Sequence, residues 1–163
     1  MVAVVAVPQS PSVPDRQDTA ERWQRARERA KAANVQLAYY AASDTWFVTS
    51  ASHPGVVYES DGHGCTCLAY ANGDPVCLHR AAVRDHLAAR AALGIELLAA
   101  KAALATIDDE LAAYNASVDG DGAFAYRNRR RHDELLAVRD IAQRRVWDAQ
   151  DALGRTQDGQ AAA

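Results

Sequence analysis

Three cysteines and one histidine are paired at short spacing in the middle of this 163-residue chain. Cys65 and Cys67 form a C-x-C pair, and after a nine-residue loop Cys77 and His79 form a C-x-H pair. A disulfide framework would spread an even number of cysteines along the chain, whereas all three cysteines lie in this one segment. Structural zinc is held by four thiolate or imidazole ligands in a tetrahedron. The spacing therefore predicts one Zn²⁺ bound by these four side chains.

The predicted zinc site is structural and has no catalytic role. Three thiolates and one imidazole complete the coordination shell, so no position is left for the water that a catalytic zinc activates. His63 is a rival fourth ligand, two residues before Cys65 in a turn flanked by glycines, and His53 and His86 are less favoured rivals. The alternative to a metal site is three free or buried cysteines beside an unrelated histidine. The paired spacing favours the metal.

Short β-strands are predicted ahead of the ligands, in segments rich in β-branched and aromatic residues. The predicted strands are residues 35–40, 46–50 and 56–60. The turn signal at residues 72–75 brings the two ligand pairs together, and a helix that follows Cys77 places His79 in its first turn. Strands so few and so short are not stable as an isolated sheet. We therefore expect the metal to hold this part of the chain together.

The ligand segment resembles the SWIM-type zinc-finger family, whose pattern is C-x-C, a variable loop and C-x-H between a β-hairpin and a helix. The four ligands match that pattern one for one, residues 46–58 resemble the hairpin, and residues 81–83 begin the helix. The resemblance covers residues 45–90 and implies DNA or protein binding, because family members occur in transposases, Swi/Snf-type ATPases, ubiquitin ligases and recombination factors. Leu78 departs from the family, which often has a Lys or Arg between the last Cys and the His.

A highly charged helix is predicted before this segment, over residues 15–34, where Asp15 or Asp18 can cap its N-terminus. Its few apolar positions are Trp23, Ala26 and Ala30. So thin an apolar stripe predicts a helix that docks weakly or spans solvent.

Two Ala- and Leu-rich helices are predicted after the segment, joined by a glycine-containing turn at residues 117–122. The first apolar seam consists of Leu93, Leu97, Ala100, Leu104, Ile107, Leu111 and Tyr114. The second helix is expected over residues 126–153, with a seam of Leu135, Val138, Ala142, Val146, Ala149 and Leu153. Two seamed helices with a short connection favour an antiparallel, coiled-coil-like hairpin within one chain. A dimeric coiled coil is the alternative arrangement.

The predicted fold class is therefore α+β. A zinc-stapled ββα module in residues 35–92 follows the charged helix and precedes the helical hairpin of residues 93–155. Residues 1–14 and 156–163 are predicted to be disordered tails, because they offer too few apolar side chains to bury.

The charge distribution argues against nucleic acid as the main partner. The chain has a formal net charge of -3, and residues 35–92 hold five acidic against three basic residues. One Zn²⁺ with three thiolates adds about -1 to that module. Basic residues gather instead at residues 22–31 and 127–131, where solvated helix faces are the favoured explanation. The candidate phosphate contacts of the second cluster are Arg127, Arg129, Arg130 and Arg131.

No candidate catalytic group remains outside the ligands, so we predict a protein that is not an enzyme. The carboxylates at residues 108–110 fall on the polar face of a predicted helix. No apolar run approaches the about 20 residues of a membrane span. The apolar residues 1–7 lack the basic region of a signal peptide, so an intracellular location is expected.

The predicted function is that of an adaptor, which binds a protein partner or self-associates through its helical arms. The alternative is weak, non-specific nucleic-acid binding through the two arginine clusters, because phosphate contacts need basic side chains.

Overall fold

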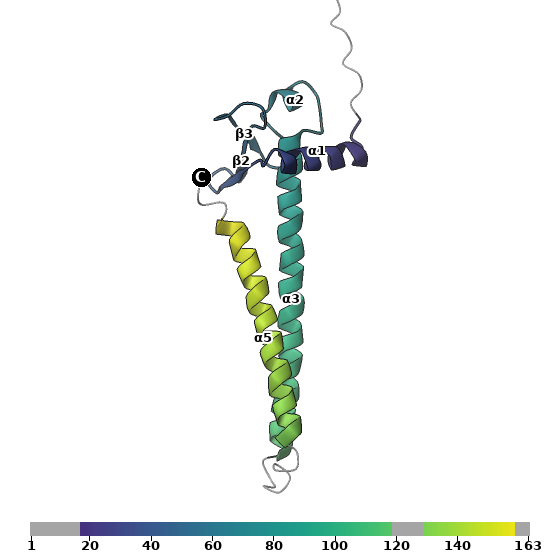
Figure 1. Cartoon of the computed structure of the whole chain (residues 1–163), viewed down its shortest axis with the longest axis vertical. Coiled ribbons are helices and arrows are strands. Elements are labelled where there is room, and N and C mark those ends of the chain that lie inside the picture. The colour runs from purple at the N-terminus through teal and green to yellow at the C-terminus, as the bar shows by residue number, and fades with distance from the viewer. Residues whose placement is uncertain (1–16, 119–128, 159–163) are drawn as a thin grey trace, which may run out of the picture. The chain divides into compact units, whose positions relative to one another are not determined.

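The computed structural model describes residues 17–118 and 129–158. They form an α+β fold, as predicted, with a three-stranded antiparallel sheet, an N-terminal helix and a long helical hairpin (Figure 1). In chain order the elements are α1 (Ala20–Ala32), β1 (Leu37–Tyr40), β2 (Thr45–Thr49), β3 (Val57–Ser60), α2 (Leu68–Ala71), α3 (Leu78–Val118) and α5 (Arg129–Asp158). The chain divides into two compact units after Arg84, inside α3. The predicted boundary between residues 92 and 93 lies within the same helix.

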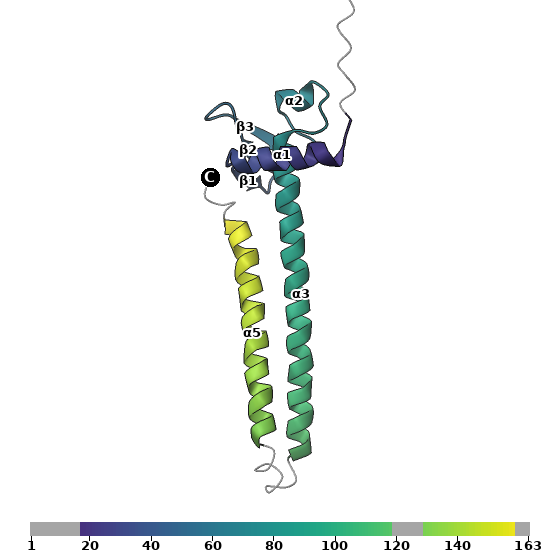
Figure 2. The same ribbon diagram turned by 45° about the vertical axis from the view of Figure 1, so that its right-hand side comes forward.

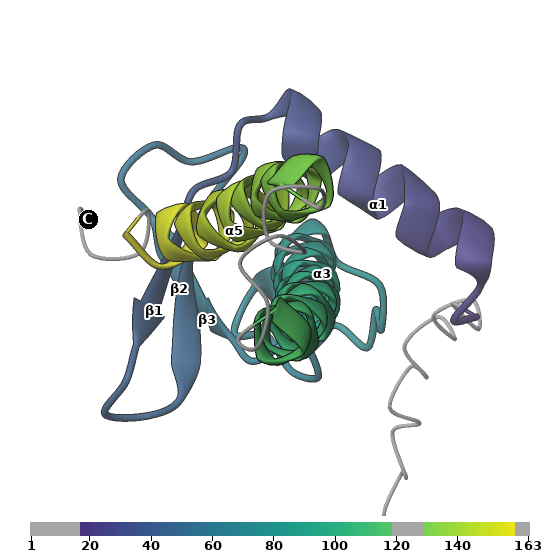
Figure 3. The same cartoon turned by 90° about the horizontal axis from the view of Figure 1, so that it is seen from below.

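The sheet has the strand order β1-β2-β3 (Figure 3). Its strands agree with the predicted segments to within two residues at each end. Burial alternates along the central strand β2, because successive side chains of a strand point to opposite faces. Trp46 and Val48 are buried on one face and pack against Val83 of α3. Gly55, in the turn between β2 and β3, has a φ of +82°, a left-handed conformation that favours glycine.

Helix α1 begins at Ala20, and the hydroxyl of Thr19 caps it by accepting a hydrogen bond from the backbone N–H of Arg22 at 3.4 Å. The prediction of Asp18 as the cap is wrong, because its carboxylate instead accepts a hydrogen bond from the indole N–H of Trp23. Asp15 lies outside the described residues. The predicted apolar stripe is confirmed, since the buried residues of α1 are Trp23, Ala26 and Ala30.

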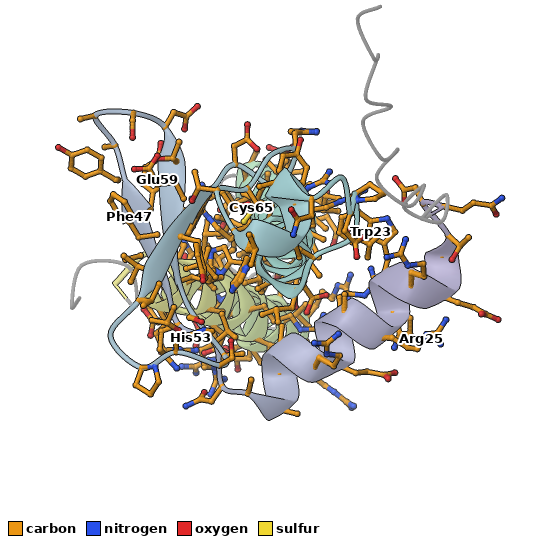
Figure 4. All side chains as sticks on the ribbon, turned by 90° about the horizontal axis from the view of Figure 1, so that it is seen from above. Trp23, Arg25, Phe47, His53, Glu59 and Cys65 are labelled. Atoms are coloured by element: carbon orange, nitrogen blue, oxygen red, sulfur yellow. The ribbon has the colours of Figure 1, made fainter. Side chains whose placement is uncertain are left out.

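Helix α1 is docked within the first unit and does not span solvent. Trp23 packs in a buried cluster with Val76 and Ala81. The guanidinium of Arg22 forms a partly buried ion pair with Asp74, with 2.6 Å between nitrogen and oxygen. Figure 4 shows Trp23 on the inner side of α1 and Arg25 on its outer side. The sequence predicted only weak docking of α1, because its partners are residues about 50 positions later in the chain.

The second unit is an antiparallel hairpin of α3 and α5, which lie side by side (Figure 2). Arg139 of α5 forms an ion pair with Asp108 of α3 at 2.6 Å. Nearer the end of α3, the rings of Tyr114 and His132 stack with their centroids 5.7 Å apart. Contacts that join later residues of α3 to earlier residues of α5 require antiparallel helices. The predicted hairpin within one chain is therefore confirmed.

Most predicted seam positions of the hairpin are buried or half-buried. The buried ones are Leu111, Leu135, Ala142, Val146 and Ala149. The prediction is wrong for Val138, whose side chain is 48 % exposed. A strict heptad assignment treats Val138 as inward-facing, whereas a straight helix drifts away from a 3.5-residue repeat.

The ends of the hairpin helices also differ from the prediction. Helix α5 continues to Asp158, so residues 156–158 are helical, and the Thr156 hydroxyl donates to the carbonyl of Leu153 at 2.6 Å. Helix α3 ends at Val118, inside the predicted turn. The predicted helix start at Tyr126 and the tails at residues 1–14 and 159–163 lie outside the described residues.

Candidate metal centre

The four predicted ligands come together in the first unit. Their ligand atoms all lie within 4.8 Å of one another, and all four residues are buried. Cys65 follows β3, Cys67 immediately precedes α2, Cys77 immediately precedes α3, and His79 is the second residue of α3. Figure 4 shows Cys65 in the interior of this unit. The predicted rivals are not part of this group.

A hydrogen-bonded turn after β3 positions Cys65. The carboxylate of Asp61 accepts backbone hydrogen bonds from Gly64 at 2.5 Å and from His63 at 2.7 Å. The hydroxyl of Ser60 donates to the carbonyl of Gly64 at 2.7 Å, and Ser60 pairs with Cys65 as an isolated β-bridge. The hydrogen bond from Gly64 lowers the pKa of Asp61. His63 thus contributes its backbone to the turn that presents the ligand.

The short helix α2 positions Cys67, and sequence analysis did not predict it. Four residues are too few to show a helical period, so the sequence carried no signal for α2. The predicted turn at residues 72–75 is confirmed by Gly73, whose φ is +77°, and by the carboxylate of Asp74, which accepts from the N–H of Val76 at 3.0 Å. These contacts lead the chain back to Cys77 and the start of α3.

The chemistry of the buried donors fits a metal ion. His79 is 6 % exposed, and neither of its ring nitrogens has a hydrogen-bond partner among the described residues. A buried polar atom without a partner costs about 1–3 kcal/mol. A metal bound to one nitrogen supplies the missing interaction there. The ring of Tyr58 packs against the imidazole, with centroids 4.6 Å apart, and fixes its orientation.

The thiols interact strongly with one another. A hydrogen bond from Cys65 lowers the pKa of Cys77 to about 4, and the hydrogen bond from the backbone N–H of Arg80 lowers it further. The same hydrogen bond to Cys77, together with burial, raises the pKa of Cys65, and burial raises that of Cys67. The group therefore already favours one thiolate. A bound cation would stabilise the other two as thiolates.

No family model, curated protein or solved structure matches this chain.

Arg80 ties the ligand loop to α1, a role that sequence analysis missed. Its side chain is largely buried, at 8 % exposure, and donates to the carbonyl of Gly62 at 3.3 Å and to that of Pro75. Its guanidinium lies 5.2 Å from the ring centroids of Trp23 and Tyr70. The Arg80 guanidinium thus connects the segment before Cys65 to the segment before Cys77. Its positive charge lies beside three cysteines that are negatively charged as thiolates. Its position directly after His79 was the only signal in the sequence.

The predicted phosphate contacts lie away from the ligands along the chain. Arg129, Arg130 and Arg131 form the first turn of α5, and Arg127 lies outside the described residues. Arg130 pairs with Glu134 at 3.0 Å, and Arg131 lies 3.9 Å from the carboxylates of Glu134 and Glu110. Two of these guanidiniums therefore have carboxylate partners.

The arginine cluster at residues 22–31 is also partly neutralised. Arg22 pairs with Asp74, and Arg25 lies 3.7 Å from Glu21.

Within residues 17–118 and 129–158, no helix is long and apolar enough to span a bilayer.

Proposed function

We propose that this chain binds one structural Zn²⁺ through Cys65, Cys67, Cys77 and His79, and that it is a non-enzymatic adaptor of the SWIM type. The observation that carries the proposal is the burial of these four donor groups within 4.8 Å of one another. Three thiolates and one imidazole favour zinc over Mg²⁺ or Ca²⁺, which prefer oxygen ligands. A complete set of four protein ligands suits a structural site, since a catalytic zinc keeps one position for water.

The surroundings of the ligands support the SWIM type. Two antiparallel strands, β2 and β3, precede the C-x-C pair, and α3 follows the C-x-H pair. This order of hairpin, ligands and helix is the one that the family resemblance implies.

The candidate catalytic groups have structural surroundings. The hydroxyl of Ser52 and Nδ1 of His53 lie 2.9 Å apart, but both side chains are exposed in a turn. Asp108 is held by Arg139 across the hairpin. A catalytic base is typically oriented by a third group, and in the described residues no third side chain hydrogen-bonds to the imidazole of His53, which supports a role without catalysis.

Exposed apolar side chains support a protein partner. In the first unit, Tyr40, Val57 and Leu68 are exposed, and in the second unit Trp147 is exposed. Aromatic and apolar side chains are typical of the centre of protein interfaces. The ion pairs of the arginine clusters leave less positive charge for phosphates.

Metal analysis of the purified chain tests the zinc site. We expect one zinc per chain, retained in His63→Ala and lost in Cys67→Ser, because only the second change removes a ligand. Wild-type protein that purifies and folds without metal would overturn the site.

A salt titration with a generic DNA duplex tests the adaptor role. We expect binding only at low salt, and its loss when Arg129, Arg130 and Arg131 are changed to Gln. Tight, salt-tolerant DNA binding that survives these changes would replace the adaptor with a nucleic-acid-binding protein.

A further inference from the structure

Two adjoining cavities open on the surface of the first unit. The first has a volume of about 320 Å³ and is lined by three arginines of α1, so we call it the arginine cavity. The second has a volume of about 290 Å³ and is lined by Leu68 of α2 and Leu78 of α3, so we call it the leucine cavity. Arg29 and Leu78 line both, which makes the two cavities one continuous surface.

The arginine cavity has an excess of positive charge. Among the described residues that line it, Asp74 is the only acidic one, and Arg22 at 2.6 Å and a backbone N–H at 3.0 Å already hold its carboxylate. Arg25 lies 3.7 Å from Glu21, but both side chains are mostly exposed, and such a pair is weak. Arg29 is exposed and forms no ion pair in the described part of the chain. Two guanidiniums are therefore available to an anion.

The spacing of these two arginines favours an anion that binds between them. Arg25 and Arg29 are four residues apart in α1, so they share a helix face and their like charges repel each other. A carboxylate between them would remove this repulsion and accept charge-assisted hydrogen bonds from both guanidiniums. The arginine cavity is thus suited to the side chain of an Asp or a Glu.

The leucine cavity is suited to an apolar side chain. Leu68 is 72 % exposed and Leu78 is half-buried, so both offer apolar surface to a ligand. Two cysteine ligands of the metal also line this cavity, and their negative charge as thiolates disfavours a carboxylate there. Of its polar side chains, Ser52 and His53 hydrogen-bond with each other at 2.9 Å.

We propose that the two cavities bind a segment of a protein partner in which an acidic side chain lies within a few residues of a large apolar one. The acidic side chain binds between Arg25 and Arg29, and the apolar one packs on Leu68 and Leu78. The proposal rests on the proposed adaptor function and names the chemistry of its partner. Residues 1–14 hold no acidic residue, so that segment of the chain cannot supply the carboxylate.

The charge of the first unit fits a protein partner better than a nucleic acid. Residues 17–84 hold seven acidic and seven basic residues, and a bound Zn²⁺ with three thiolates adds about -1. Duplex DNA carries about one charge per 1.7 Å of its axis, so it needs an extended basic surface. A single carboxylate needs only a local pair of guanidiniums. The apolar leucine cavity offers phosphates no favourable contact.

Selection of random peptides of about eight residues on the full, zinc-loaded chain tests the surface. We expect selected peptides to combine Asp or Glu with Leu, Ile or Phe, and to lose about tenfold in affinity when the acidic residue is made an amide. Arg29→Glu should shift the selection to basic peptides, because it reverses the charge of the cavity. The matched control is Arg27→Glu, which makes the same change in α1 at a residue that lines neither cavity. It should leave the selection unchanged.

The apolar half of the surface has its own test. We expect Leu68→Ser to weaken binding of a selected peptide with zinc content unchanged, because Leu68 is exposed and its loss leaves no cavity in the core. Leu98→Ser is the control, since Leu98 is 69 % exposed in the second unit. A selected peptide that binds Leu68→Ser and wild type equally would overturn the assignment of the leucine cavity.

Zinc content and the titration with a generic DNA duplex, measured on the same samples, separate this proposal from the adaptor function. A zinc-loaded chain that does not bind the duplex and selects no acidic peptide would overturn this surface but not the adaptor role. Selected peptides that bind Arg29→Glu as tightly as wild type would do the same. Tight, salt-tolerant duplex binding that is lost in Arg29→Glu would overturn both, because α1 would then bind phosphates.

Discussion

The strands of the first unit have four or five residues each, whereas α5 in the second unit has 30 residues. A helix satisfies its backbone hydrogen bonds within itself, while a short strand depends on its neighbours. The buried side chains of the first unit are divided among small clusters, one of which is formed by the three cysteines. The hairpin instead repeats similar apolar contacts along two helices. The first unit therefore depends on cross-links, and the second depends on repeated packing.

The cross-links of the first unit join residues far apart in sequence. The four ligands connect the end of β3 to the start of α3. Arg80 reaches Gly62, and Arg22 reaches Asp74. Each of these contacts acts at a single point, so no equivalent neighbouring contact compensates for its loss. Along the hairpin, similar contacts are repeated and can compensate for one another.

Removal of the metal should produce the largest difference in folding between the two units. We expect a strong chelator, or Cys67→Ser, to unfold β1–β3, because zinc binding in small zinc domains supplies roughly 10–16 kcal/mol of folding free energy. Residues 85–118 and 129–158 should keep their helical signal. Hydrogen exchange read segment by segment, together with far-UV circular dichroism, measures both outcomes.

The control for metal removal is His63→Ala, which leaves all four ligands in place. Strands that stay protected from exchange in metal-free protein would show that the first unit does not depend on its cross-links in this way.

A core substitution in the hairpin should have the opposite pattern. We expect Leu111→Ala to cost about 2–5 kcal/mol of unfolding free energy, because it removes a buried side chain and leaves a cavity. Zinc content should not change, since the ligands belong to the first unit. Denaturant unfolding followed by circular dichroism, with zinc measured on the same sample, tests this prediction.

Leu98→Ala is the matched control, because it makes the same chemical change at an exposed position of α3. It should shift stability by less than about 0.5 kcal/mol. Equal effects of the two substitutions would contradict the packing assigned to the seam.

The ion pair between Arg22 and Asp74 should have the smallest effect. We expect Arg22→Gln to loosen α1 by about 1 kcal/mol, because the pair is partly buried and joins α1 to the ligand loop. Faster hydrogen exchange confined to Ala20–Ala32 would report it. Arg25→Gln removes an exposed pair and should leave this exchange unchanged; acceleration by Arg25→Gln alone would refute the docking contact.

The sequence was sufficient to predict features whose signals are local. The four ligands are paired within 15 residues, and the structure brings them together. The strands follow from β-branched and aromatic residues, and the hairpin follows from apolar residues at helical spacing around a turn. In each case the interacting residues, or the periodic pattern that they form, lie within one continuous segment.

The prediction failed where several equivalent local choices existed. Thr19 and Asp18 are both good helix caps, and the partner that Asp18 finds in Trp23 decides between them. Val138 fits an apolar repeat, but its side chain is 48 % exposed and lines an open groove between α3 and α5. Neither choice can be read from residue type alone.

The sequence by itself therefore determined which side chains form the candidate metal centre and which segments become the strands and the long helices, but not the four-residue helix α2. Only the tertiary structure decided that Arg80 is buried between Trp23 and Tyr70, that α1 docks through Arg22 and Asp74, and that the hairpin keeps an open apolar groove. The physical reason is distance along the chain. Secondary structure and ligand pairing depend on neighbours in sequence, whereas burial and charge pairing depend on residues that only folding brings together.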